Sequence, residues 1–593
     1  MTKAIPQRAT LLFGFSVFFG LLSLLCWPPN TAYSARPKRC IAHRDCNNGE
    51  LCLRRRCQKK PRFRVVLSGV GTTAFHLAIA PVLWQGPIKG HPKEDIQRDL
   101  ETQLDDNFRR LVGMIRVLER KTFLEKEGEN GIELGTFSFV TWQNVAANGL
   151  IKIALRAQDE KHLRVMFRYY DVDTTRQEIR VNRVVTRDRL RWFLHQVCND
   201  IYKKLTGQEG IFTSYIAYVK SNPKGGKDIW VMDFDGQNRR RVISNGAINI
   251  LPNWSPTGRY LTFTSFLEGR PYLYKLDLAT EQLSRISRLR GNYTGGTYAP
   301  SGQRLAFSIS TKTGSDIYAS DPNGNNLRRL TKTWGINISP TWSPDGKRIA
   351  FVSERFATPH VFVMNADGSN QLRLTYKGEY NQEPQWSPKA SEILFTARDE
   401  FLKYDLFVIQ LSSDEQGKTS HEYRRLTQNQ GRNFEACWSP DGRFILFIST
   451  RSGPRKLYIM NADGSEQQPF LKIKGDVESP AWSPIINQQY LPDGAAGRSY
   501  YRRVRMLEGP PLQELPEPKD EQGPEQPTRD PALPQKISPT TAPIPPQPAL
   551  PHPPRTDIST PTERRRLSLR TLPPSTQPLK PSGSSPTPPP RPR

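Results

Sequence analysis

The sequence predicts an α/β N-terminal domain, an all-β six-bladed β-propeller and a disordered, proline-rich C-terminal tail. The first observation is a short phrase, an aromatic residue followed by Ser-Pro or Ala-Pro, that recurs six times in the middle of the chain. Successive copies lie 44, 44, 44, 52 and 44 residues apart, close to the roughly 40–50 residues of a propeller blade. The third observation is composition, because half of the 51 prolines follow residue 500. The six copies begin at Trp254, Tyr298, Trp342, Trp386, Trp438 and Trp482.

One period contains a set of short apolar runs. After Trp342-Ser343-Pro344 the runs cover residues 348–352, 361–364 and 372–375, with Asn365-Ala366-Asp367-Gly368 between the last two. Runs of four or five residues bounded by Gly, Pro, Asn or Asp are typical of antiparallel strands joined by tight turns. Each period is therefore predicted to form one four-stranded blade, whose first strand carries the aromatic residue.

The two ends of the repeat array complement each other. The apolar strand at residues 215–219 has no aromatic strand before it, and the aromatic strand at Trp482 has no successor. A propeller leaves edge strands exposed unless its ring closes, so we expect these two strands to pair and complete six blades. Removal of the residues beyond 478 is then expected to unfold the ring.

Residues 1–35 are predicted to be a secretory signal peptide. Lys3 and Arg8 form a basic start, residues 11–27 form an apolar run, and Ala32-Tyr33-Ser34-Ala35 supplies small residues at the exit. The alternative is an uncleaved anchor, although the run is shorter than the roughly 20 residues of a spanning helix. The mature chain is therefore expected outside the cytoplasm.

Residues 36–60 form a cysteine-rich segment. An even, clustered set of cysteines in an exported protein favours disulfides, with three pairings open. Zinc is the alternative, but the tight Cys-x-x-Cys pair typical of zinc sites is missing. Cys198 and Cys437 are expected to be isolated, buried thiols. The clustered cysteines are Cys40, Cys46, Cys52 and Cys57.

Residues 61–207 are predicted to form the α/β domain. Helical periodicity covers residues 92–118, and shorter helical patterns cover residues 137–147 and 188–205. Ser68-Gly69-Val70-Gly71 lacks the third glycine and the Lys-Ser/Thr ending of a phosphate-binding loop, so no nucleotide or other cofactor is expected. Strand patterns cover residues 63–67, 77–83, 151–155, 163–169 and 178–184.

Residues 489–593 contain too few apolar side chains to form a core and are predicted to be the disordered tail. The formal net charge of the chain is +28. No helix-turn-helix, RNA-binding sheet signature or aromatic stacking ladder accompanies this charge, so nucleic acid is not expected as a partner. The charge instead favours acidic protein surfaces, cell-wall polymer or anionic lipid, which the basic cluster Arg564-Arg565-Arg566 also suits.

Catalysis is not expected. The competing class is a hydrolase, because propellers also accompany serine peptidases, but the chain contains no Gly-x-Ser-x-Gly elbow. The eight histidines form no His-Glu-x-x-His pair, so a zinc hydrolase lacks support. The sequence therefore favours a binding protein.

Several segments resemble one family. The join at residues 202–219, the repeats around Pro-x-Trp-Ser-Pro-Asp-Gly, the ending at residues 479–484 and the upstream segment at residues 79–87 are similar to the TolB family of periplasmic propeller proteins. The resemblance covers roughly residues 63–484. The cysteine-rich segment and the proline-rich tail depart from the family pattern, which puts the family's N-terminal switch in doubt.

The resemblance implies a periplasmic adaptor of the Tol-Pal system. Such an adaptor is a monomer, peripheral to the outer membrane, that binds the lipoprotein Pal and the inner-membrane protein TolA. Its role is outer-membrane integrity and constriction during division. The alternative is an envelope propeller outside the Tol system that serves as a scaffold or senses glycans.

The resemblance also implies that the funnel mouth, where loops enter the inner strands, receives Pal. The alternative is that the residues there only shape turns, and a cation near Glu383 and Glu435 is a further alternative. The Asp-Gly segments of the repeats lack the glutamate that closes a calcium loop, so we expect hairpin turns there. The expected contacts are Asn292, Gly295, Ile338, Glu383 and Glu435.

The distribution of charged residues in the loops predicts a second binding surface. In a propeller the loop that enters each aromatic strand shares a face with the loop between the second and third strands, and the latter loops carry a positive charge in every blade. The Asp-Gly turns lie at the opposite face. We expect Arg355, Arg398 and Arg455 to steer acidic partners, the alternative being that these charges are merely solvated.

Overall fold

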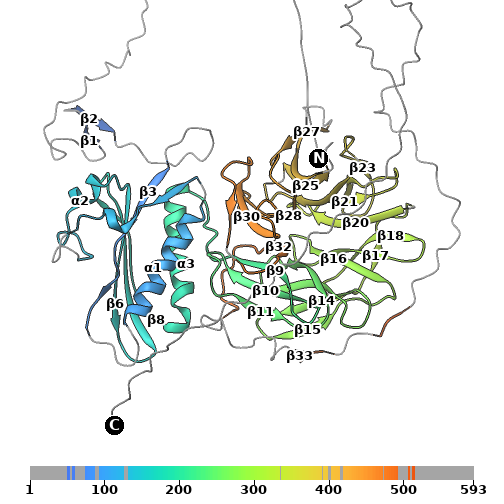
Figure 1. Cartoon of the computed structure of the whole chain (residues 1–593), viewed down its shortest axis with the longest axis horizontal. Coiled ribbons are helices and arrows are strands. Elements are labelled where there is room, and N and C mark those ends of the chain that lie inside the picture. The colour runs from blue at the N-terminus through green and yellow to red at the C-terminus, as the bar shows by residue number, and fades with distance from the viewer. Residues whose placement is uncertain are drawn as a thin grey trace, which may run out of the picture. The chain divides into compact units, whose positions relative to one another are not determined.

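The computed structural model describes two compact units, Met1–Pro524 and Glu525–Arg593, and all residues placed well enough to describe belong to the first (Figure 1). The predicted signal peptide and the predicted strand at residues 63–67 lie outside the described residues. Within them, no helix is long and apolar enough to cross a membrane. The described residues are 50–53, 56–59, 74–86, 93–111, 113–125, 131–333, 335–378, 380–389, 391–398, 403–413, 419–471, 473–491, 505–507 and 511–513.

The cysteine-rich segment contributes a two-stranded hairpin, β1 (Glu50–Leu53) and β2 (Arg56–Lys59). The strands are antiparallel, and Cys52 and Cys57 are paired positions of the backbone register. The side chains of this hairpin lie outside the described set, so the disulfide expectation stays a prediction.

An α/β domain follows, as the sequence predicts. Its sheet has the order β5-β3-β6-β7-β8, and β4 also pairs with β6. Helices α1 (Lys93–Arg109) and α3 (Leu190–Thr206) pack against each other and against one face of this sheet (Figure 1). Short helix α2 (Phe139–Asn144) and the segment before it cover the other face, where Trp142 is buried. The strands are β3 (Phe75–Ile79), β4 (Leu83–Trp84), β5 (Ile115–Val117), β6 (Gly149–Ala157), β7 (His162–Asp171) and β8 (Arg176–Thr186).

The predicted helix over residues 92–118 is wrong at its end. Its apolar face is buried as expected, but the helix ends at Arg109, and Gly113 adopts a positive φ of 71°. Glycine reaches this conformation without a steric penalty, and the chain reverses there. Ile115–Val117 then forms β5 in parallel pairing with β3. The apolar residues of a short buried strand can continue the helical spacing of the segment before it. Periodicity alone therefore did not show that the helix ends before β5 begins.

The β-propeller begins at β9, and the regular elements of its described residues are all β-strands. The strand orders are β11-β10-β9-β32, β12-β13-β14-β15-β33, β16-β17-β18-β20-β21-β22-β23 with β19 on β18, β24-β25-β26-β27, and β28-β29-β30-β31. Strands of the first half are β9 (Tyr215–Ser221), β10 (Lys227–Asp233), β11 (Arg240–Ile243), β12 (Asn249–Trp254), β13 (Tyr260–Ser265), β14 (Tyr272–Asp277), β15 (Gln282–Arg285), β16 (Asn292–Tyr298), β17 (Leu305–Ser310), β18 (Gly314–Ser320) and β19 (Arg328–Arg329). Strands of the second half are β20 (Gly335–Trp342), β21 (Arg348–Ser353), β22 (His360–Asn365), β23 (Leu372–Arg373), β24 (Asn381–Trp386), β25 (Glu392–Arg398), β26 (Tyr404–Ser413), β27 (Thr419–Arg425), β28 (Asn433–Trp438), β29 (Phe444–Ser449), β30 (Lys456–Asn461), β31 (Gln468–Pro469) and β32 (Glu478–Trp482).

The predicted closure of the ring is confirmed. Strand β32 pairs antiparallel with β9, with Ala481 opposite Ala217 and Trp482 opposite Ile216. The backbone N–H of Tyr215 also donates to Ser483 Oγ at 2.8 Å. The last aromatic strand therefore completes the sheet that the first propeller strand begins.

The single 52-residue spacing has a local cause. It separates Trp386 from Trp438, and the sheet between them has an unusually long outer hairpin, in which β26 pairs with β27 over seven residue pairs. The extra residues therefore lengthen the outer strands of this sheet and leave the pattern of the inner strands unchanged.

The prediction that everything after residue 489 is disordered is wrong for two short pieces. Strand β33 (Arg505–Met506) pairs in parallel with β15, and Gln513 forms a bridge with Leu289. Backbone pairing of this kind needs no particular composition, so the proline-rich sequence gave no signal for it.

Candidate functional site: the channel of the propeller

Every aromatic strand contains a β-bulge three residues before its aromatic residue. The register of these strands against their neighbours shifts there in all six cases. A positive φ is uncommon for residues other than glycine and costs on the order of 1–3 kcal/mol, so the surrounding sheet must hold it. The six bulge residues, here called the bulge ring, are Leu251 (φ 54°), Gly295 (φ 61°), Ser339 (φ 55°), Glu383 (φ 55°), Glu435 (φ 48°) and Ser479 (φ 47°).

The bulge ring was not anticipated from the sequence, although a signal existed. A proline directly follows the bulge residue in four of the six strands. Proline inside a strand marks an edge or a bulge, because it has no N–H for the ladder. These prolines are Pro252, Pro340, Pro384 and Pro480.

The aromatic residues lock neighbouring inner strands together. The indole N–H of Trp254 donates to the carbonyl of Ala481 at 3.0 Å, and that of Trp342 donates to Thr297 at 3.2 Å. Trp438 donates in the same way to Gln385 at 3.1 Å. Each acceptor lies one residue before the aromatic residue of the preceding repeat, so these three contacts are equivalent, whereas the indole N–H of Trp482 donates to Ser214 Oγ at 2.9 Å.

The one tyrosine in the series behaves differently. The hydroxyl of Tyr298 is buried and has no hydrogen-bond partner among the described residues. Burial raises the pKa of this hydroxyl, which therefore stays protonated. The Tyr298 position thus lacks the hydrogen bond that the indoles of Trp254, Trp342 and Trp438 make.

These strands enclose a channel of about 680 Å³. All six bulge residues line it, together with the six aromatic residues and the prolines that follow them. Of the predicted contacts, Gly295, Ile338, Glu383 and Glu435 line the channel. Asn292 is the exposed first residue of β16 and is not among the described lining residues. The structure therefore brings four of the five predicted contacts into one cavity.

Two glutamates link successive bulges. Glu383 Oε2 accepts from the backbone N–H of Glu435 at 2.8 Å and from Thr396 Oγ1 at 2.9 Å. Glu435 Oε2 in turn accepts from the backbone N–H of Ser479 at 2.6 Å. Each carboxylate therefore reaches the bulge of the following blade, which places both on the channel wall.

These two carboxyl groups are shifted toward the protonated form. Burial raises the pKa of Glu383. Burial, followed by the charge of Glu383, raises the pKa of Glu435 to about 7. The acidity of the channel therefore changes near neutral pH, where ordinary glutamates are fully ionised.

Arg355, one of the predicted steering residues, is packed into the fold. Its guanidinium lies 4.6 Å from the centroid of the Phe362 ring and donates to Ser353 Oγ at 2.8 Å and Gln371 Oε1 at 2.7 Å. Burial lowers its pKa to about 10. Arg451 repeats this arrangement on Tyr458 in a later blade. Sequence reasoning missed this structural role.

The other two steering residues are also engaged. Arg398 lies over the ring of Tyr380, 5.8 Å from its centroid. Arg455 is exposed, and its guanidinium pairs with Glu478 Oε1 at 2.6 Å. Of the three, Arg455 is the one whose charge faces solvent most fully.

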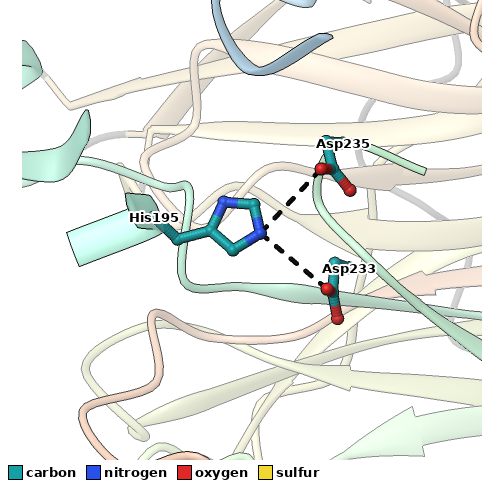
Figure 2. Close-up of side chains that lie close together, drawn as sticks. All are labelled: His195, Asp233 and Asp235. Atoms are coloured by element: carbon teal, nitrogen blue, oxygen red, sulfur yellow. Dashed lines mark ion pairs between the residues drawn. The ribbon is translucent and has the colours of Figure 1, made fainter. Parts of the chain in front are cut away.

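A second cluster of ionisable residues joins α3 to the first sheet of the propeller (Figure 2). His195 Nε2 lies 3.8 Å from Asp233 Oδ2 and 4.0 Å from Asp235 Oδ2, and all three side chains are buried. Arg191 contacts the same two oxygens, at 3.5 Å from Asp233 and 2.6 Å from Asp235.

This cluster has the residue types of a metal site, but a positively charged guanidinium already contacts its carboxylates. Burial opposes ionisation of Asp233, yet the contact with His195 and the charge of Arg191 hold its pKa below the ordinary value. A metal ion would have to share both carboxylate oxygens with a guanidinium, and the two cations would repel each other. The cluster is better described as an ionic joint between the α/β domain and the propeller.

Comparison with known proteins agrees with this architecture. Residues 202–486 match the family described as TolB beta propeller domain, and residues 63–178 match the TolB amino-terminal domain. The crystal structure of TolB from Acinetobacter baumannii has a TM-score of 0.57 and 24% identity, covering 70% of this chain and 97% of that one. At this identity the likeness shows the fold.

Curated relatives carry the name Tol-Pal system protein TolB. The protein from Methylobacillus flagellatus is 30% identical over 228 residues, which is 38% of this chain and 50% of the relative. The protein from Myxococcus xanthus is 40% identical over 159 residues, which is 27% of this chain and 36% of the relative. The chain thus spans about half the length, or less, of the curated relatives it matches. With both characteristic domains present in order along the sequence, the chain belongs to the TolB family.

Proposed function

We propose that this chain is a non-catalytic adaptor of a Tol-Pal-like system. It acts in the periplasm and binds a Pal-like lipoprotein and a TolA-like inner-membrane protein. Through these contacts it maintains outer-membrane integrity and supports constriction at division. The family, and the name carried by its relatives, support this role.

The observation that carries the proposal is the channel. Six strands from distant parts of the sequence place one bulge residue each on its wall, and the aromatic locks hold those strands in fixed positions. A cavity of about 680 Å³ with a few fixed polar groups suits a protruding polypeptide segment. Glu383 and Glu435 give this wall acceptors for the N–H groups or positive side chains of such a segment.

The proposal also includes the domain organisation. The boundaries are a signal peptide at residues 1–35, a cysteine-rich segment at 36–60, a TolB-like α/β domain at 61–207, a propeller at 208–488 and a tail at 489–593. Six blades follow if the joined sheet from β16 to β23 counts as two. Its halves meet through a two-pair parallel contact between β18 and β20, which supports that division.

The contact surface is proposed at the channel mouth. Asn292, Gly295, Ile338, Glu383 and Glu435 make the contacts with the Pal-like lipoprotein. Arg355, Arg398 and Arg455 stay in the proposal as the positive rim. Because the first two of these arginines also pack against aromatic rings, charge reversal at Arg455 is the cleaner test of steering.

The experiment is calorimetric titration of the full chain with the Pal-like lipoprotein of its own organism. We expect saturable binding that weakens about tenfold, or 1.4 kcal/mol, when Glu383→Gln and Glu435→Gln are combined. Glu422→Gln, at an exposed position on outer strand β27, is the matched control and should leave the affinity unchanged.

Two results would contradict the proposal. One is the absence of binding between the wild-type chain and the lipoprotein. The other is recovery of glycans, without a Pal-like or TolA-like protein, when the chain is used to capture components of its own envelope. That second result would favour a scaffold outside the Tol system.

A further inference from the structure

The outer edge of the second propeller sheet carries a strand that comes from beyond the propeller. The N–H of Arg505 donates to the carbonyl of Glu281 at 3.0 Å, and the N–H of Leu507 donates to Leu283 at 2.8 Å. The register is parallel, with Gln282 opposite Arg505. Strand β15 thus pairs with β14 on one side and with β33 on the other.

A second contact follows a few residues later. The N–H of Gln513 donates to the carbonyl of Arg288 at 2.7 Å, and its own carbonyl accepts from Arg290 at 2.8 Å. Leu512 is partly buried and packs against the apolar cluster that contains Leu283. Backbone hydrogen bonds at both ends and the side chain of Leu512 therefore hold the segment.

The outer strands of a propeller are open edges. Each presents a row of N–H and C=O groups, to which an extended chain can add as another strand. Within the described residues the strand order ends at β11, β23, β27 and β31 in other sheets, whereas β15 is followed by β33. The loop from β15 to β16 supplies the second clamp, because it contains both Arg288 and Arg290.

We propose that strand β15 and the loop at residues 286–290 form a binding site for an extended peptide, and that residues 505–507 and 511–513 of this same chain are its occupant. The site fixes the start of the proline-rich tail on the second propeller sheet. It covers one of the outer edges to which an extended partner could otherwise add. This inference is independent of the proposed Tol-Pal role, because none of its residues line the channel.

Covalent connection explains how so small a contact stays occupied. The propeller ends near Leu491, a buried residue of the same apolar cluster, and about a dozen residues lead to Arg505. A connection of this length keeps the effective concentration of a tethered segment near millimolar, so weak pairing suffices. The same pairing is then weak enough for a competing peptide to displace it.

The first test measures hydrogen exchange at single amides in the full chain. Protection is expected at Leu507 and Arg290, which lie on opposite sides of the contact. Leu512→Asp should speed hydrogen exchange at both amides at least tenfold, while the melting temperature changes little. Exchange at Leu507 as fast in the wild type as in Leu512→Asp would overturn the proposal.

The second test uses a labelled synthetic peptide of residues 503–515 added to the full-length Leu512→Asp variant. It should bind there and bind the wild type at least tenfold more weakly, because the wild-type site is filled. N-methylation at Leu507 removes a donor of the pairing and should abolish binding. N-methylation at Met506 is the matched control, since the bonds to β15 come from its two neighbours, and it should be tolerated.

Two further outcomes, one of the peptide test and one of the exchange test, would overturn the proposal. Equal affinity of the two N-methylated peptides would show that the backbone donor of Leu507 does not hold the peptide, which then binds through its side chains or nonspecifically. Amide protection that is lost on dilution, as a dimer dissociates, would show that a second copy supplies the strand, which contradicts occupancy by the same chain.

Discussion

The inner and outer strands of the propeller differ in what holds them in place. The inner strands repeat one design, because each contains a bulge and an aromatic residue that is followed two positions later by a proline on the channel wall. The indoles of Trp254, Trp342 and Trp438 donate to the preceding inner strand. The outer strands vary from two residues in β23 and β31 to seven in β27, and one of them accepts a segment from outside the ring. Side chains therefore specify the inside of the ring, whereas backbone pairing dominates its outer edge.

Truncation of an inner aromatic residue is the strongest way to test this contrast. Trp342→Ala removes a buried indole and its hydrogen bond to Thr297, and should lower the free energy of unfolding by about 3–5 kcal/mol. Leu372→Ala in outer strand β23 of the same sheet removes a side chain that is 49% exposed, and should cost less than about 0.5 kcal/mol. Urea unfolding of both variants measures the difference. Equal losses would remove the distinction between inner and outer strands.

The difference between inner and outer strands also explains which features could be predicted from the sequence. The spacing of Trp254, Trp342 and their equivalents predicted the strands and the closure of β32 on β9, because each copy meets the same packing requirement. Glu383 and Glu435 were predicted as channel residues from the family resemblance. Neither their hydrogen bonds to the next bulge nor their raised pKa values could be predicted, because both depend on the spatial order of strands far apart in the chain.

Residues outside the repeat were predicted less well. Arg355 was expected at a solvent-facing rim, yet it packs on Phe362, because loop position says nothing about which way a long side chain folds back. The pairing of Arg505–Met506 with β15 left no trace in composition. The ionic joint of His195 with Asp233 and Asp235 joins two domains and likewise has no local pattern.

Stability should depend on pH through Glu435. Its folded pKa of about 7 lies above its ordinary value of 4.5, so its contribution to stability is fully present below pH 4.5 and is lost as the pH rises through 7. Glu435→Gln should therefore raise the free energy of unfolding at pH 8 by about 1–3 kcal/mol and leave it nearly unchanged at pH 4.5.

Thermal unfolding between pH 4.5 and pH 8 measures this effect. Glu422→Gln on the outer strand β27 is the control and should follow the wild-type curve throughout. If the stability of Glu435→Gln changes with pH as steeply as that of the wild type, the pKa of Glu435 is not raised. That result would weaken the contrast between the inside and the outside of the ring.

The two arginines test whether the outer half contains specific side-chain contacts as well. Arg355→Ala removes three hydrogen bonds and a guanidinium on the Phe362 ring, and should destabilise the chain by about 1–2 kcal/mol. Arg455→Ala removes an exposed ion pair and should cost less than about 0.5 kcal/mol. Chemical unfolding at moderate salt distinguishes the two. The reverse order would mean that the rim charges stabilise the ring by pairing rather than by packing.

The smallest effect is expected at Tyr298. Tyr298→Phe removes a buried hydroxyl without a partner among the described residues, so stability should be unchanged or rise by up to about 1 kcal/mol. Tyr170→Phe is the matched control, because that hydroxyl donates to the carbonyl of Ile132 and its loss should cost about 1 kcal/mol. A clear loss of unfolding free energy for Tyr298→Phe in denaturant titrations would show that this hydroxyl has a hydrogen-bond partner.

Site-specific photo-crosslinking tests the central claim most directly, namely that the inside of the ring is the binding surface. A photoreactive amino acid at Ile338, on the channel wall, and another at Leu372, on the outer strand of the same sheet, are compared in the intact envelope. We predict an adduct with a Pal-like lipoprotein from position 338 and none from position 372. An adduct from position 372 alone would contradict it.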